Sequence, residues 1–143
     1  MSVGLLLITH NDIGTALLGT VTRMLGGCPL QARVLAVHEE GDCDRLCSLA
    51  LDWVLALDAG DGVLVLTDLF GSTPANIAAA LQARNAVRVV SGVNLPMLVR
   101  VLNYSGLALD ALAEKAVSGG RDGVMCSCRP EAAAGAPKEA CKR

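Results

Sequence analysis

The chain has 143 residues, enough for one domain that buries a single core. Hydrophobic residues make up 52% of it but aromatic residues only 2%, so we expect a core of Val, Leu, Ile and Ala, as in helices packed on a buried sheet. The formal net charge is −2 with both signs scattered along the chain, which argues against a nucleic-acid-binding surface and a polybasic membrane patch.

The first predicted element is a strand over residues 3–9, an apolar run that reads as buried on both faces. This run is too short for a membrane span and lacks the basic flank of a signal peptide, so we expect a cytoplasmic protein. The strand ends at His10. Asn11 and Asp12 follow as a candidate helix cap, and apolar residues then recur at helical spacing until the glycines at 26 and 27.

The order of strand, polar turn and helix then repeats along the chain. Further strands are predicted at residues 32–37, 62–67 and 87–90. Between them we expect two helices. Asp44 is a candidate cap for the first, which reaches Ala56, and Pro74 lies in the first turn of an alanine-rich second one, which reaches about Arg84.

Two more helices are predicted after the fourth strand, at residues 96–104 and 107–117, before Gly119 and Gly120. The last residues, 129–143, are Ala, Pro, Lys and Glu with almost no large apolar side chain, and we expect a mobile tail there. The sequence therefore predicts one folded domain over residues 1–128 and no second one.

Alternating strands and helices predict an α/β fold with an open, mainly parallel sheet, helices on both faces and a flavodoxin-like topology. Ligands of such sheets bind beyond the carboxyl ends of the strands, where the strand order switches. Three polar turns follow predicted strands, at residues 9–12, 68–73 and 91–94. We expect the functional site among these turns.

His10 and Asp68 are the candidate reactive groups. An imidazole at a strand end could act as a base, a ligand or a nucleophile. A hydrogen bond from one ring nitrogen to Asp68 would fix the tautomer and leave the lone pair of the other nitrogen free. It would also stabilise the cation formed when that nitrogen takes a phosphoryl group. Asp68 could equally cap the following helix, so spacing leaves both roles open.

The turn Gly71-Ser72-Thr73 offers backbone N–H groups, hydroxyls and a helix N-terminus, which together favour phosphate oxygens. It could also be a simple helix start. The sequence contains no Walker-type loop, no Gly-x-Gly-x-x-Gly and no Gly-x-Ser-x-Gly elbow. Phosphoryl transfer remains compatible with these residues because it needs mostly positioning and charge stabilisation.

The remaining candidates have structural interpretations. His38 ends the second strand beside two glutamates that would repel a phosphoryl group, so we assign it to the surface. Asn94 most simply caps a helix, although it could also contact the rim of the site, and Trp53 is interpreted as packing. The six cysteines are expected to be free thiols, because their spacing is not that of paired zinc ligands: Cys28, Cys43, Cys47, Cys126, Cys128 and Cys141.

Four segments carry a resemblance to a known family. They are the strand ending in Ile-Thr-His at residue 10, and the sequences TDLFGSTPAN (67–76), SGVNLPML (91–98) and GRDGV (120–124). In this order the chain resembles, over about residues 1–125, the enzyme IIA component of the mannose family of the bacterial phosphoenolpyruvate-dependent sugar phosphotransferase system.

The resemblance implies that His10 accepts a phosphoryl group from the histidine-containing phosphocarrier protein and passes it to a IIB component, without metal or other cofactor. It implies that Asp68 orients the imidazole and that Gly71, Ser72 and Thr73 line the phosphoryl pocket. Asn11 and Asn94, which follow predicted strands, are candidates for the rim of the site. The resemblance further implies a homodimer that exchanges a C-terminal strand, for which residues 123–126 are the candidate. Contact with a membrane would be indirect, through a permease.

Asn11 departs from the family pattern, which usually has glycine after the histidine. Two other functions stay open. The phosphorylation state of His10 could be read by a regulatory target without sugar transport, or His10 could serve a kinase, as in the related phosphotransferase subunit of dihydroxyacetone kinase.

Overall fold

The computed structural model describes residues 2–84 and 86–127. Strands and helices alternate along this part of the chain, in the order β1 (Gly4–His10), α1 (Ile13–Leu25), β2 (Ala32–Val37), α2 (Cys43–Leu57), β3 (Val63–Thr67), α3 (Thr73–Leu81), β4 (Val87–Ser91), α4 (Leu95–Asn103) and α5 (Leu109–Asp122). The predicted tail, residues 129–143, lies outside the described residues. No helix of the described part is long and apolar enough to cross a bilayer.

The strands form one parallel sheet in the order β2-β1-β3-β4, which confirms the predicted α/β fold and open sheet. The chain adds β2 on one side of β1 and β3 on the other, so the strand order switches at β1. In the register, His10 faces Val37 of β2, and Ile8 faces Thr67 of β3. His10 and Asp68, which follows Thr67, therefore meet at the carboxyl edge of the sheet.

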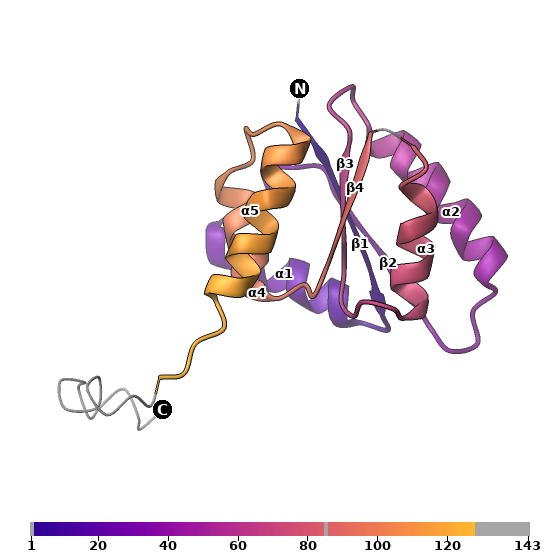
Figure 1. Ribbon diagram of the computed structural model, residues 1–143, viewed down its shortest axis with the longest axis horizontal. Coiled ribbons are helices and arrows are strands. Elements are labelled where there is room, and N and C mark those ends of the chain that lie inside the picture. Colours follow the sequence, from indigo (N-terminus) through magenta and orange to yellow (C-terminus); the bar gives the residue numbers. More distant parts are fainter. Residues whose placement is uncertain (1, 85, 128–143) are drawn as a thin grey trace.

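The core has two layers, one on each face of the sheet (Figure 1). Alternate residues of β1 point to opposite faces: Leu5 and Leu7 pack with α1, α4 and α5, whereas Leu6 and Ile8 pack with α2 and α3. All four leucine and isoleucine side chains are fully buried. This two-sided burial explains why the first strand reads as a continuous apolar run.

The tryptophan and the tyrosine of the chain lie on opposite sides of the sheet. Trp53 of α2 packs partly buried against the α2–α3 layer, as predicted, and the Arg33 guanidinium lies 5.4 Å from the centre of its ring. Tyr104 caps α4 directly after its last residue, on the opposite side, where it is exposed and the Lys115 ammonium lies 4.4 Å from its ring centre.

The structure corrects one predicted helix cap and confirms another in position only. Asp42, not Asp44, caps α2: its carboxylate accepts the N–H groups of Asp44 (3.0 Å) and Arg45 (3.5 Å), because Asp42 has the extended backbone of a cap whereas Asp44 already lies in the first turn. At α1, Asp12 occupies the cap position, as predicted, but its side chain makes no cap bond. The buried Thr9 hydroxyl instead accepts the N–H of Gly14 at 2.8 Å.

Gly119 and Gly120 do not end the last helix, as the sequence had suggested. The helix α5 continues to Asp122, because both glycines are buried against α4. A Cβ at Gly119 would stand 2.8 Å from Cβ of Arg100, and one at Gly120 would stand 2.8 Å from Cε of Met97. These glycines allow two helices to approach closely. Residues 124–127, which include most of the candidate exchange strand, form no strand within this chain.

Candidate functional site

The site is centred on the imidazole of His10, at the end of β1. Its Nδ1 lies 2.8 Å from Oδ2 of Asp68, and its backbone N–H donates to the same oxygen at 2.9 Å. The His10 side chain is 40% exposed and that of Asp68 only 11%. With Nδ1 engaged, Nε2 is the ring nitrogen whose lone pair can form a new bond. The structure thus brings together the two residues that spacing alone left uncertain.

The surroundings of the Asp68 carboxylate favour its ionised form. Partial burial raises its pKa, but hydrogen bonds from the backbone and ring of His10, together with the charge of that ring, outweigh burial and hold the pKa below its ordinary value. The second oxygen, Oδ1, accepts the N–H of Leu69 at 3.0 Å. Both carboxylate oxygens are therefore fixed, and the anion favours the His10 tautomer with hydrogen on Nδ1.

The predicted phosphate-binding turn follows Asp68 in the loop between β3 and α3. Gly71 has φ 82°, a left-handed conformation suited to glycine. The Ser72 hydroxyl donates to the carbonyl of Leu69 at 2.5 Å, so its hydrogen is already used. Thr73 is exposed at the first position of α3, where N–H groups lack partners within the helix. Thr73 is therefore the hydroxyl of this turn that is open to a ligand.

The two rim candidates have different roles. Asn94 caps α4, as predicted: its carbonyl oxygen accepts the N–H of Met97 (2.9 Å) and its amide donates to the carbonyl of Gly120 (3.1 Å). These bonds tie α4 to α5. Asn11 instead lies beside the site, directly after His10, and its Oδ1 lies 3.0 Å from Nδ1 of His38.

His38 is exposed, as predicted, but its contact with Asn11 was missed. The predicted bounds of the first strand, residues 3–9, would have placed His10 rather than Asn11 opposite His38, whereas the observed strand extends to His10 and so pairs His10 with Val37. Because His10 and Val37 are the last pair of the parallel ladder, the residues that follow them, Asn11 and His38, come together.

Exposed apolar side chains border the site and were not predicted. Leu69 and Phe70, directly after Asp68, are 62% and 86% exposed, and Ile13 at the start of α1 is 45% exposed. Exposed acidic residues also follow β1 and β2, among them Asp12 and Glu39. Exposed apolar side chains surrounded by charged residues are typical of a protein-binding surface.

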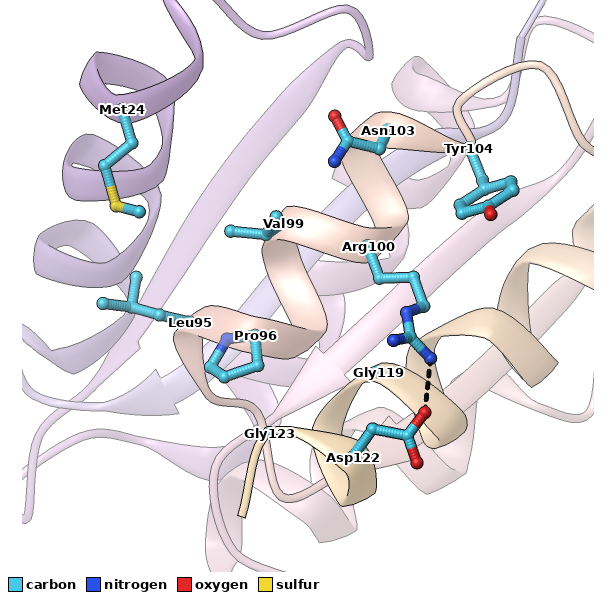
Figure 2. A pocket seen from close by; sticks show the side chains of 10 residues that line it. All are labelled: Met24, Leu95, Pro96, Val99, Arg100, Asn103, Tyr104, Gly119, Asp122 and Gly123. Carbon is cyan, nitrogen blue, oxygen red and sulfur yellow. Dashed lines mark hydrogen bonds and ion pairs between the residues drawn. The ribbon is translucent and has the colours of Figure 1, made fainter. Parts of the chain in front are cut away.

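The structure also has a groove of about 420 Å³ away from these residues, between the end of α1 and the helices α4 and α5 (Figure 2). Arg100 points across it to Asp122, and their nitrogen and oxygen lie 2.8 Å apart. Neither His10 nor Asp68 lines this groove. Within residues 2–84 and 86–127, no three His, Cys, Asp or Glu side chains are grouped so that they could hold a metal ion.

Comparison with known proteins gives a consistent family match. The family model EIIA-man, described as the PTS system fructose IIA component, matches residues 4–117. The chain is 31% identical to the PTS system mannose-specific EIIAB component of Escherichia coli strain K12 over 98% of its own length. It covers 46% of that relative, so the chain spans about half the length of the curated EIIAB proteins it matches.

Solved structures agree with this match. The mannose/sorbose specific IIA subunit from Enterococcus faecalis is 28% identical and superposes with a TM-score of 0.76, covering 91% of this chain and 98% of that one. The component EIIA from Streptococcus agalactiae superposes with a TM-score of 0.77 over 87% of this chain and 96% of that one. At 21% identity, the latter likeness concerns the fold alone.

Proposed function

The chain belongs to the EIIA-man family of IIA components of the sugar phosphotransferase system, and from this premise we propose that His10 is its phosphoryl-accepting residue. The observation that carries the proposal is the contact of His10 Nδ1 with the ionised Asp68, 2.8 Å away. We propose that the histidine-containing phosphocarrier protein supplies the phosphoryl group in the cytoplasm and that a IIB component receives it.

In the proposed transfer, the lone pair of Nε2 attacks the phosphorus of the donor phosphohistidine. As the new nitrogen–phosphorus bond forms, the old one breaks and its electron pair returns to the donor ring. The His10 ring keeps its Nδ1 hydrogen and becomes cationic, and the Asp68 anion stabilises that charge. Transfer to the IIB component repeats the step with His10 as the donor. No nucleotide or metal is needed for either step.

The turn at residues 71–73 would bind the phosphoryl oxygens. The backbone N–H groups at the start of α3 and the positive end of its dipole favour a dianionic group. Within this turn we assign the exposed Thr73 hydroxyl the direct contact, and we assign Ser72 to holding the loop through Leu69.

Protein partners suit the surroundings of His10. The exposed Leu69 and Phe70, in the loop directly after Asp68, offer an apolar contact of the kind that anchors protein–protein interfaces. The relatives matched over nearly the whole chain are named as mannose-specific and mannose/sorbose specific components of the phosphotransferase system, so phosphoryl transfer in sugar uptake is the function we propose. Nothing in these matches favours the regulatory alternative.

We also propose a homodimer that forms by exchange of the C-terminal segment. Among the described strands, β4 pairs only with β3 and lies at the edge of the sheet. Val89, Val90 and Val117 line hollows along this edge. Val124 and Met125, in the extended segment after α5, are 76% and 82% exposed. Sedimentation of the protein tests this part of the proposal, since a monomer at all concentrations contradicts it.

The central proposal is tested by incubating the protein with labelled phosphoenolpyruvate, enzyme I and the phosphocarrier protein. We expect one acid-labile phosphoryl group in the wild type and none in His10→Ala. His38→Ala is the matched control, because it removes the other histidine of the chain and is expected to retain the label. Equal labelling of the wild type and His10→Ala would refute the proposal.

A further inference from the structure

The turn after His10 has an unusual backbone. Asn11 has φ 46° and is the one non-glycine residue with a positive φ among residues 2–84 and 86–127. This left-handed conformation is costly for most side chains, and asparagine is among the few that tolerate it. A residue in such a conformation stays there because its surroundings hold it.

Two contacts hold Asn11, one from the last residue of β2 and one from the residue that follows it. Its backbone N–H donates to the carbonyl of Val37 at 3.0 Å and so extends the ladder between β1 and β2 by one bond. Its side-chain Oδ1 lies 3.0 Å from Nδ1 of His38, which is the natural donor in this pair. The side chain of Asn11, which follows β1, thus contacts His38, which follows β2.

These contacts complete the support of His10. On the β3 side, Asp68 holds both the ring and the backbone N–H of His10. On the β2 side, the next residue, Asn11, is held by Val37 and His38. The strand end that carries the reactive imidazole is therefore tied to both of its neighbours.

We propose that His38 is a positioning residue for His10, acting through the side chain of Asn11 to fix the turn that follows the phosphoryl-accepting imidazole. The inference rests on the proposed function of His10 as phosphoryl acceptor. His38 itself does not suit phosphoryl acceptance, since its ring contacts a neutral amide and is followed by Glu39 and Glu40. A carboxylate like Asp68, which would stabilise a cationic ring, is what His10 has instead.

A double-mutant cycle tests this role. Because φ 46° suits glycine, Asn11→Gly keeps the turn and removes only the contact with His38. We expect His38→Ala to lower kcat for transfer from the phosphorylated phosphocarrier by about two- to tenfold, as expected for one hydrogen bond, with KM unchanged. In the Asn11→Gly background the same substitution should change nothing further. His38→Asn, whose amide nitrogen replaces Nδ1, should restore most of the rate.

Equal losses in the two backgrounds, or no loss in the wild-type background, would overturn the inference. All variants are expected to fold, since both side chains are exposed, and urea unfolding checks this.

A second measurement needs no phosphoryl transfer. The ¹⁵N signals of the His10 ring in the unphosphorylated protein should shift or broaden in His38→Ala, but only when Asn11 is present. If the wild type takes no label, the proposed function fails, and these spectra still decide the role of His38. Unchanged spectra would then refute it.

Discussion

Replacing Asp68 with Asn removes the negative charge beside His10 and keeps the shape of the side chain. With Nδ1 and Oδ2 2.8 Å apart, Coulomb's law gives an attraction of about 6 kcal/mol at an effective dielectric constant of about 20, and about 1.5 kcal/mol in bulk water. The His10 side chain is 40% exposed, so solvent screens the pair. We therefore expect the transition state to lose about 1.5–3 kcal/mol, a slowing of about ten- to hundredfold.

The assay is rapid-quench transfer from the labelled phosphocarrier protein at saturating donor. Asp52→Asn is the matched control: it makes the same change of net charge at an exposed position of α2 and should transfer at the wild-type rate. Asp68→Ala should be slower still, because it also leaves the His10 backbone N–H without its acceptor, at a cost of about 1–3 kcal/mol in stability with the fold retained. Transfer by Asp68→Asn within twofold of the wild type would remove Asp68 from the mechanism.

Three further predictions concern packing, acid stability and docking. Gly14→Ala would place its Cβ 2.5 Å from the Thr9 hydroxyl oxygen, so it should lower the free energy of unfolding in urea by about 1–3 kcal/mol. Gly19→Ala in the same helix is the control: its Cβ meets nothing within 4 Å, so it should not lower the free energy of unfolding. The folded-state pKa of Asp68 lies below its ordinary value of 3.8, so the ionised carboxylate stabilises the fold fully above pH 3.8, and this stabilisation is lost as the pH falls through the folded-state pKa. The free energies of unfolding of the wild type and Asp68→Asn in urea should therefore converge in acid. A difference that grows as the pH falls would contradict the lowered pKa. Phe70→Ala should raise the KM for the phosphocarrier protein about tenfold with unchanged kcat and unfolding, and an unchanged KM would exclude this residue from docking.

Periodicity predicted the sheet well because the strands are buried on both faces and leave continuous apolar runs. β2 has the predicted bounds, residues 32–37; β3 and β4 each differ by one residue at one end, and β1 differs by one residue at both ends. The errors lie where a residue type has two structural uses. Gly119 and Gly120 read as a helix end, but they serve the contact between α4 and α5, which depends on a partner helix that local pattern does not reveal.

Sequence reasoning placed His10 and Asp68 at neighbouring strand ends, since both follow apolar strands and parallel strands end at one edge. The sequence pattern could not establish the hydrogen bond between His10 and Asp68, because this bond depends on the register of β1 with β3 and on the rotamers of the two side chains. The contact between Asn11 and His38 was missed because charge pattern alone assigned His38 to the surface. The exposure of Phe70 also depends on how the loop leaves the sheet, which residue type does not determine.

The separation of the core into two layers makes the two faces of the sheet distinguishable by intrinsic fluorescence. The chain has one tryptophan and one tyrosine, with Trp53 on the α2–α3 face and Tyr104 at the end of α4 on the other. Selective excitation of the indole reports the first face alone, and the phenol signal reports the contact of Tyr104 with Lys115 of α5 on the second. Coincident denaturation curves from the two fluorophores would show that both layers melt as a single cooperative unit, whereas separated midpoints would identify the layer that opens first.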